Sequence, residues 1–351
     1  MKNKVRIGIA SFAHYHANFW AQAINNSSSA ELVGIWDDDE NRGKMAAGNY
    51  FTNYYHNLQE LLLECDGIGI VSETSKHPEL VEAAVKANVN IILEKPMAID
   101  MDGCSRIYQA VHNSGLLFMQ NLPKRYDPIN HELVDLVRRG DIGKILMVRI
   151  RHGNYHLLDL GEKANDMWYA DPTLSGGGAL IDEGVHAADF LYWLLGEPEQ
   201  VYSSISSKTL GLKVEDSAIA IFTYQSGTIA EICTSNSFVA GEESIEVYGT
   251  NGSAILSGVD LASKDFSSQP FLKVFQQKHE RGSWKGHSVI PQFQRDDFHH
   301  QGINFFIDCL LSGKRPIVNL DDAWKSIAMI TSAYKSASTG KAQTIKFPDK
   351  L

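Results

Sequence analysis

The sequence has few of the features that mark secreted or membrane proteins. Only four of its 351 residues are cysteine, and they form no CxxC pair or other metal-type spacing: Cys65, Cys104, Cys233 and Cys309. Such scattered cysteines are typical of reduced thiols, so we expect a cytoplasmic protein. No apolar run approaches the length of a membrane span. We expect no export signal, because polar residues soon interrupt the run after the basic N-terminal residues.

Concentrated positive charge is missing as well. The formal net charge is −10, and no run of lysine and arginine stands out. This balance argues against nucleic acid or an anionic membrane as a partner. A content of 44% hydrophobic and 21% charged residues is ordinary for a globular protein, and the length allows two domains.

A glycine fingerprint is absent where a dinucleotide-binding chain would carry one. Residues 5–10 predict a buried strand, and a helical period begins near Ala17. The turn between them has Ser11, Ala13 and His16 at the three glycine positions of G-x-G-x-x-G. The first two are small, as a backbone approaching phosphate requires, but the third is not. The turn Ser11-Phe12-Ala13-His14 is therefore a candidate pyrophosphate site with a weak motif.

Apolar runs and helical periods alternate through the first third of the chain. Further strands are predicted at 31–36, 67–71, 89–93 and 116–119, with helical segments between them. This alternation predicts βαβ units and a parallel sheet. The composition changes between Pro123 and Pro128, so we expect one domain over residues 1–123 and a second over 124–351.

Polar residues follow four of these predicted strands. They are the Ser11 turn, Asp37, the segment 72–74 and Lys95. Because ligands of parallel sheets bind at the carboxyl ends of the strands, we expect these residues to share one edge. Lys95 could donate a hydrogen bond to a developing alkoxide or carbonyl oxygen. The alternative is a solvent-facing lysine paired with Glu94.

Asp37 begins a run of three aspartates at the end of the second predicted strand. An acid about 20 residues beyond the first turn can accept hydrogen bonds from a ribose diol. Alternatively, Asp38 or Asp39 caps the helix predicted at 41–47, and both roles are compatible. Three acids would repel a 2′-phosphate, which favours NAD over NADP, although Arg42 lies nearby.

Three glycines at 176–178 precede an apolar helical pattern over 179–195. Unrestricted glycines let a chain pass close to a ligand. Asp182 and His186 lie four positions apart, hence on one helical face, and could form an acid–base pair. The alternative is a helix with Asp182 in its first turns and His186 in the core.

The remaining sequence predicts an antiparallel sheet. Strands are expected at 145–150, 201–206, 218–224, 228–234, 245–248 and 254–256, with hairpin-type turns between several of them. We interpret 263–291 as an irregular loop region. His152, Asn154 and His156 alternate along an extended segment, which suits polar substrate contacts or an ordinary loop better than a metal site. Trp168 could stack on a ligand ring or simply pack.

Taken in order, these segments resemble the Gfo/Idh/MocA oxidoreductases, which include glucose–fructose oxidoreductase and inositol dehydrogenase. Residues 68–77 resemble the family's stretch ending T-P-N-x-x-H, and Glu94-Lys95-Pro96 matches its E-K-P motif. Arg125-Tyr126-Asp127-Pro128 resembles its R-F-D-P. The glycines with Asp182 and His186 match its glycine-rich D-x-x-x-H helix. The resemblance covers nearly the whole chain.

The resemblance implies an α/β fold: an N-terminal dinucleotide-binding Rossmann domain and a C-terminal α/β domain with a large, mostly antiparallel sheet for substrate binding and oligomerisation. It implies NAD(P)-dependent hydride transfer at a hydroxyl-bearing carbon of a sugar or polyol, and a homodimer or homotetramer. It also implies that the bond before Pro96 is cis. We expect no metal.

Carried over residue by residue, the resemblance makes Lys95, Asp182 and His186 the catalytic set. The cofactor-binding set is Ser11, Phe12, Ala13, His14, Asp37, Ser72, Glu73, Thr74, His77, Glu94 and Lys95. The substrate-binding set is Lys95, Arg125, His156, Trp168, Asp182, His186 and His300. The lysine, imidazole and carboxylate are expected to meet around one crevice.

Two departures from the family pattern stand out. Ser72-Glu73 replaces the usual Thr-Pro, and Trp168-Tyr169 replaces the usual Trp-Arg, which bears on substrate contacts more than on the fold. Two other functions fit the resemblance: a sugar lyase or hydrolase that oxidises its substrate transiently, and a sugar sensor without activity. The complete set of Lys95, Asp182 and His186 argues against the sensor.

Overall fold

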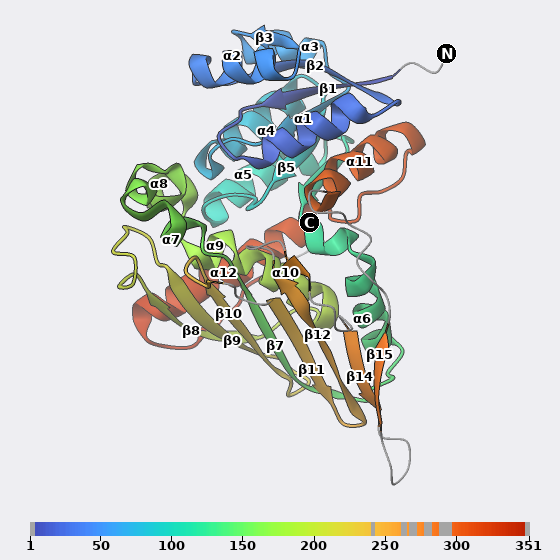
Figure 1. Cartoon of the computed structure of the whole chain (residues 1–351), viewed down its shortest axis with the longest axis vertical. Helices are drawn as coiled ribbons and strands as arrows, with labels where there is room; N and C mark the ends of the chain where they lie inside the picture. The colour runs from blue at the N-terminus through green and yellow to red at the C-terminus, as the bar shows by residue number, and fades with distance from the viewer. Residues whose placement is uncertain are drawn as a thin grey trace. The chain divides into compact units, whose positions relative to one another are not determined.

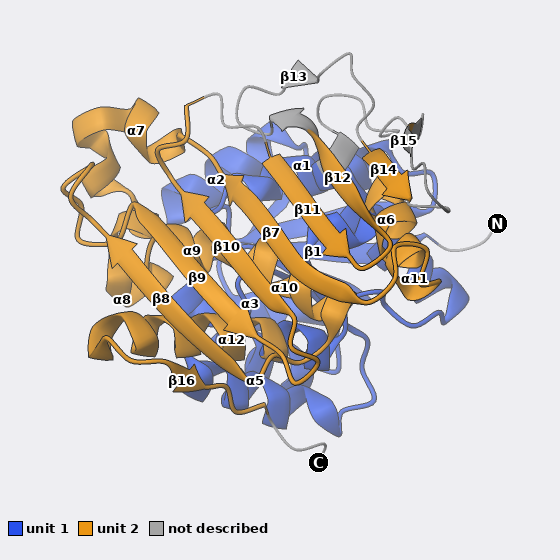
Figure 2. Cartoon of the chain, turned by 90° about the horizontal axis from the view of Figure 1, so that it is seen from below, with its two compact units in different colours: residues 1–126, 293–324 blue, residues 127–292, 325–351 orange. Residues whose placement is uncertain are grey.

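The computed structural model describes residues 4–239, 243–260, 265–266, 272–276, 283–287 and 297–347. The chain divides into two compact units, coloured separately in Figure 2: residues 1–126 with 293–324, and residues 127–292 with 325–351. The sequence assigned everything from residue 124 onward to one domain, and the structure differs by returning 293–324 to the first unit. The reason is α11 (Asp297–Ser312), whose Ile303, Phe306 and Ile307 complete the first unit's core.

The first unit contains a six-stranded sheet in the order β3-β2-β1-β4-β5-β6, and all its neighbouring strands are parallel. This is the strand order of a Rossmann fold. The central strands are apolar and almost wholly buried, as strands covered on both faces must be. The strands are β1 Val5–Ala10, β2 Ala30–Trp36, β3 Asn53–Tyr55, β4 Gly67–Ile70, β5 Asn90–Glu94 and β6 Phe118–Asn121. The short edge strand β3 was not predicted.

Helices connect these strands, and α1 (His16–Asn26) buries Trp20 completely. A Cβ at Gly69 of β4 would lie 2.9 Å from that indole, so glycine allows the helix to pack closely on the strand. Asp39 caps α2 by accepting hydrogen bonds from the backbone of Asn41 and Arg42. The other helices are α2 Glu40–Asn49, α3 Leu58–Leu63, α4 His77–Lys86 and α5 Met101–His112, with short 3₁₀ turns at Thr74–Lys76 and Pro123–Tyr126.

The second unit contains a mostly antiparallel sheet whose described strands follow the order β15-β14-β12-β11-β7-β10-β9-β8-β16, with β13 paired to β12 (Figure 1). The pair β7–β10 is parallel. The strands are β7 Ile145–Gly153, β8 Gln200–Ser206, β9 Ser217–Thr223, β10 Ile229–Ser235, β11 Glu243–Gly249, β12 Gly252–Asp260, β13 Asp265–Phe266, β14 Leu272–Gln276, β15 Ser283–His287 and β16 Gln343–Thr344. The expected sheet is confirmed. The prediction of an irregular loop over 263–291 is wrong at β13, β14 and β15. The other residues of that range fall outside the described ranges.

Helices of this unit cover one face of the sheet. Figure 2 shows α9, α10 and α12 behind the strands. The helices are α6 Pro128–Arg138, α7 His156–Leu160, α8 Pro172–Ser175, α9 Ala179–Asp182, α10 Gly184–Leu195 and α12 Leu320–Thr339, of which α12 belongs to this unit from residue 325 onward. On the other face of β7 to β10, alternating apolar side chains are exposed: Met147, Tyr202, Ile219, Ile221 and Ile229. No helix in the described ranges is both long and apolar enough to cross a membrane.

Candidate active site

The first turn of the Rossmann unit takes a glycine-like conformation without glycine. Ser11 follows β1 with a φ of 74° and is fully buried. That left-handed backbone costs a non-glycine residue about 1–2 kcal/mol. The Ser11 hydroxyl accepts a hydrogen bond from the Ala13 amide at 3.1 Å, which helps to hold the turn. Ser11 therefore adopts a backbone conformation that favours glycine.

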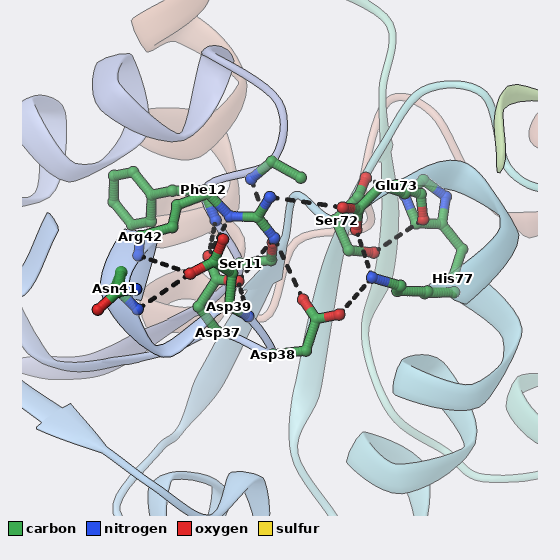
Figure 3. A network of polar contacts seen from close by, with 12 residues as sticks. Ser11, Phe12, Asp37, Asp38, Asp39, Asn41, Arg42, Ser72, Glu73 and His77 are labelled. Atoms are coloured by element: carbon green, nitrogen blue, oxygen red, sulfur yellow. Dashed lines mark hydrogen bonds and ion pairs between the residues drawn. The ribbon is translucent and has the colours of Figure 1, made fainter. Parts of the chain in front are cut away.

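Asp37 joins this turn to the end of β2 (Figure 3). Its carboxylate is buried and accepts hydrogen bonds from the Phe12 amide at 2.7 Å and the Asp39 amide at 3.0 Å. Arg42 donates to the same carboxylate through Nε at 2.8 Å and Nη2 at 2.7 Å. Four donors use the roughly four acceptor positions of a carboxylate. A ribose diol would therefore have to displace at least one of the Arg42 bonds.

Arg42 lies among several acids and one hydroxyl. It is within 3.1 Å of Asp38 and 3.4 Å of Glu73, and it donates to the Ser11 hydroxyl at 3.2 Å. Burial opposes its charge, but the three carboxylates outweigh burial and raise the pKa of the guanidinium. Lys76 pairs with Asp38 and with Glu73. Three carboxylates thus lie beside two cationic side chains, so the formal charge of this cluster is negative.

The segment after β4 is tied to the segment after β5 by His77. One ring nitrogen, Nδ1, lies 3.0 Å from the Pro96 carbonyl oxygen, and Nε2 lies 3.3 Å from that of Ser72. Burial lowers the pKa of this histidine, so the neutral ring donates to one side at a time. Ser72, Glu73 and Thr74 are all buried. His77 is therefore placed to position the loop that was predicted to bind the cofactor.

Lys95 follows β5 directly and is only 4% exposed. The solvent-facing alternative is therefore wrong. The Lys95–Pro96 bond is cis, as the resemblance implied. Glu94 is also buried, accepts a hydrogen bond from the Asn121 amide at 2.9 Å, and lies 3.2 Å from the His16 ring. The end of β5 thus carries a buried cation beside a buried anion.

Several imidazoles lie near this strand end. The rings of His14 and His16 are 4.2 Å apart, and His299 of α11 lies 4.1 Å from His16. Burial, the neighbouring His16 and the positive Lys95 all lower the pKa of His14, and Glu94 offsets them only in part, so this ring is neutral. Its Nδ1 accepts from the His16 amide at 3.2 Å, which leaves the proton on Nε2. His14 was predicted to bind the cofactor, whereas no local pattern predicted that the rings of His16 and His299 would lie beside it.

In the second unit, two of the three glycines, Gly177 and Gly178, approach the protein's own chain. A Cβ on Gly178 would lie 1.9 Å from the Glu215 carbonyl oxygen, and one on Gly177 would lie 2.1 Å from the Tyr334 hydroxyl. The Glu215 carboxylate accepts hydrogen bonds from the amides of Gly178 and Leu180 at 2.9 and 2.8 Å, and from the Tyr334 hydroxyl at 2.6 Å. The glycines are therefore explained by packing around Glu215, a residue that no local pattern predicted.

The predicted single helix over 179–195 is wrong, because it breaks at Glu183. Asp182 ends α9, and Gly184 begins α10. The His186 amide bonds to the Glu183 carbonyl oxygen in a tighter, three-residue step. His186 is 9% exposed and Asp182 is half-buried. The two predicted catalytic residues thus lie on either side of a helix junction.

Glu183, at this junction, contacts a buried histidine of β7. The His152 Nε2 lies 3.0 Å from the Glu183 carboxylate, and its Nδ1 contacts Glu243 of β11. Asn154 donates to Glu183 at 2.6 Å. The sequence singled out 152, 154 and 156 as one alternating set. The structure brings His152 and Asn154 together at Glu183, whereas His156 begins α7 and is exposed.

The other predicted substrate residues are distributed over both units. In the first unit, Arg125 is buried 3.8 Å from Asp322, and His300 lies on α11 with its ring 5.8 Å from Phe19. In the second, Trp168 is half-buried against Tyr169, with ring centroids 4.6 Å apart. Their roles in substrate binding stay predictions.

Two family models match the chain in order. The model described as an oxidoreductase family with an NAD-binding Rossmann fold matches residues 3–122, and that of the GFO/IDH/MocA C-terminal domain matches residues 131–255. The chain belongs to the GFO/IDH/MocA oxidoreductase family. The resemblance inferred from the motifs is thereby confirmed, and so is the expectation of an oxidoreductase.

Individual family members are distant in sequence but similar along the whole chain. The chain is 24% identical to 1,5-anhydro-D-fructose reductase of Ensifer adhaerens, over 94% of this chain and 96% of that protein. It is 24% identical to myo-inositol 2-dehydrogenase of Thermotoga maritima, over 95% and 96%. A levoglucosan dehydrogenase solved with NADH and L-sorbose superposes with a TM-score of 0.83 at 16% identity, covering 98% of this chain and 99% of that one.

Proposed function

We propose that this oxidoreductase is an NAD-dependent dehydrogenase that acts on a hydroxyl-bearing carbon of a sugar or polyol. The buried Lys95 at the carboxyl end of β5 carries the proposal, because an ammonium group in that position can donate a hydrogen bond to a substrate oxygen. Ligands of open parallel sheets bind at this end of the strands. The relatives named for a sugar reductase and an inositol dehydrogenase support the substrate class.

The first unit fits a dinucleotide. Ser11 adopts the left-handed turn that glycine usually provides, and Asp37 ends the second strand, where a ribose acceptor is needed. We propose NAD rather than NADP as the cofactor. Asp37, Asp38 and Glu73 already neutralise Arg42, so a 2′-phosphate would meet net negative charge. The other cofactor contacts predicted from the sequence, including His14 and Thr74, remain part of the proposal.

NAD, when bound, supplies the hydride acceptor. We propose that Lys95 donates a hydrogen bond to the substrate oxygen and stabilises it as its charge changes. His186 takes the hydroxyl proton, a task that suits an imidazole at neutral pH. Asp182 favours the imidazolium as it forms. In the reverse direction His186 returns the proton to the oxygen.

A screen for NADH absorbance tests this function with inositols, aldoses, ketoses and deoxysugars, using both cofactors. A dehydrogenase forms NADH in proportion to product, whereas an enzyme that oxidises its substrate only transiently does not. Lys95→Ala should lower kcat by about 10²–10⁴-fold while the Kd for NAD changes little. Lys86→Ala, an exposed lysine at the end of α4, is the matched control. Full turnover by Lys95→Ala would refute the proposed role.

We also propose that the uncovered face of the second unit's sheet joins two copies of the chain into a homodimer or larger homo-oligomer. The exposed isoleucines Ile219, Ile221 and Ile229 support this, because monomeric proteins rarely expose large contiguous apolar patches. Light scattering coupled to gel filtration should give an oligomer, and Ile221→Glu should shift it toward monomer. The four free thiols support the proposal of a cytoplasmic protein.

A further inference from the structure

His152 has a carboxylate facing each of its two ring nitrogens. The three residues come from separate elements: His152 from β7, Glu183 from the α9–α10 junction and Glu243 from the start of β11. Nε2 lies 3.0 Å from Glu183, and Nδ1 contacts Glu243. The imidazole is 3% exposed and each carboxylate side chain 13%. We refer to these three residues as the His152 cluster.

This arrangement favours an imidazole that carries both ring protons. An ionised carboxylate only accepts hydrogen bonds, and a neutral imidazole can donate from just one nitrogen. Each ring nitrogen faces a carboxylate as an ion pair and not as an aligned hydrogen bond, and two ionised carboxylates favour the charged imidazolium. The cluster then has a net charge of one negative unit. A carboxylate pair with an imidazole also resembles a metal site. However, in the described ranges no group of three such side chains is arranged to hold a metal ion.

The His152 cluster borders His186. The two imidazole centroids are 5.1 Å apart, with their planes at 74°. Asn154 donates to Glu183 at 2.6 Å and fixes the carboxylate that holds His152. Glu183 also lies between Asp182 and His186 in the chain, at the helix junction. The cluster thus restricts the His152 ring, which lies next to His186, and also the helix junction that precedes His186 in the chain.

We propose that His152 is a positioning residue for His186, held in its doubly protonated form by Glu183 and Glu243. The cluster fixes the orientation of the His186 ring and places net negative charge beside it when that ring takes a proton. This inference rests on the proposed function of His186. It gives a role to Glu183 and Glu243, which no sequence pattern singled out, and to His152, for which the sequence suggested only a polar substrate contact.

Steady-state kinetics on the full-length enzyme test the positioning role. His152→Leu should lower kcat about tenfold or more while KM changes less than about threefold. His152→Gln, whose amide can still donate to one carboxylate, should retain more activity than the leucine variant. Glu243→Gln keeps the shape and removes one charge, and it should also lower kcat. Glu199→Gln is the matched control, because that glutamate of the same unit is exposed and lies outside the His152 cluster.

A spectroscopic measurement tests the cluster independently of turnover. In ¹⁵N-histidine-labelled enzyme at pH 7.5, both His152 ring nitrogens should show the shifts of protonated nitrogen, with the assignment made from the His152→Gln spectrum. A His152 ring with only one protonated nitrogen would overturn the proposal that the two carboxylates hold it in its doubly protonated form. Wild-type kcat in His152→Leu, alongside an inactive His186→Asn, would overturn the positioning role and leave the proposed function intact. An inactive wild-type enzyme would overturn both.

Discussion

Replacing Asp37 by asparagine should move the cofactor preference from NAD toward NADP. In the wild-type protein the Asp37 carboxylate accepts both Arg42 bonds and the Phe12 amide, so Arg42 is held by acids and not available to a phosphate. The asparagine keeps one oxygen acceptor and the side-chain shape. It removes the negative charge that a 2′-phosphate would meet, and it weakens the grip on Arg42. NAD loses its diol acceptor at the same time.

The size of the effect follows from the charge removed. Two unit charges about 5 Å apart interact by about 3 kcal/mol at an effective dielectric constant of about 20. Salt screens this interaction, and the site is partly open to solvent at Arg42. We therefore expect removal of the Asp37 charge to change the binding free energy of the 2′-phosphate by about 1.5–3 kcal/mol. Every 1.4 kcal/mol is tenfold. The ratio of kcat/KM for NAD to that for NADP should therefore fall by about 10–100-fold.

The assay compares kcat/KM for the two cofactors with one saturating substrate. Asp102→Asn, an exposed aspartate in the first turn of α5, removes the same charge from the same unit and serves as the control. Thermal unfolding should accompany the kinetics, because Arg42 loses a partner in Asp37→Asn. A folded variant with an unchanged cofactor ratio would show that Asp37 does not lie at the ribose.

Three further predictions concern stability, and urea unfolding measures each of them. The unfolding free energy of Ser11→Gly should lie within about 1 kcal/mol of wild type, because relief of the positive φ offsets the two hydrogen bonds that are lost. Ser11→Ala loses the same hydrogen bonds and keeps the strain, so its unfolding free energy should fall by about 1–2 kcal/mol. Equal stability of the two variants would contradict a strained turn. Gly178→Ala should cost about 3 kcal/mol or more, since its Cβ would overlap the Glu215 backbone, while Gly48→Ala in open space should cost nothing. Burial raises the pKa of Glu215, so its stabilising effect is complete below the unfolded pKa of about 4.5 and declines as the pH rises through the folded value. Glu215→Gln should remove the part of the decline in unfolding free energy that Glu215 causes at rising pH. If the variant keeps the pH dependence of the wild type, the raised pKa of Glu215 is contradicted.

The Rossmann unit was largely predictable because its signals are local. Parallel strands buried on both faces appear as short apolar runs, and β1 was predicted with its observed limits. The sequence offered Asp38 and Asp39 as candidates for the N-cap of α2, and Asp39 is the residue that caps the helix. The edge strand β3 escaped notice because Asn53–Tyr55 is short, polar and only partly buried.

The features that the sequence did not reveal depend on contacts between distant segments. The break at Glu183 lies inside an uninterrupted helical pattern, and the Glu183 side chain faces His152, 31 positions earlier. The glycines suggested a ligand, whereas Glu215 and Tyr334 fill the space beside them. Likewise, α11 has an ordinary amphipathic pattern, which indicates a buried face but not the core that buries it.

Buried carboxylates hold three of the segments to which the sequence gave a function. Asp37 holds the first turn through the Phe12 amide, Glu94 contacts His16 at the start of α1, and Glu215 holds the glycine segment. Each is remote in sequence from most of what it holds, and removing one partner of a buried polar contact leaves the other unsatisfied. Substituting any of these acids should therefore lower stability and turnover together. Loss of activity in such a variant indicates a chemical role only when its unfolding free energy is preserved, which is why charge-only changes such as Asp37→Asn and Glu243→Gln are more informative than truncation to alanine.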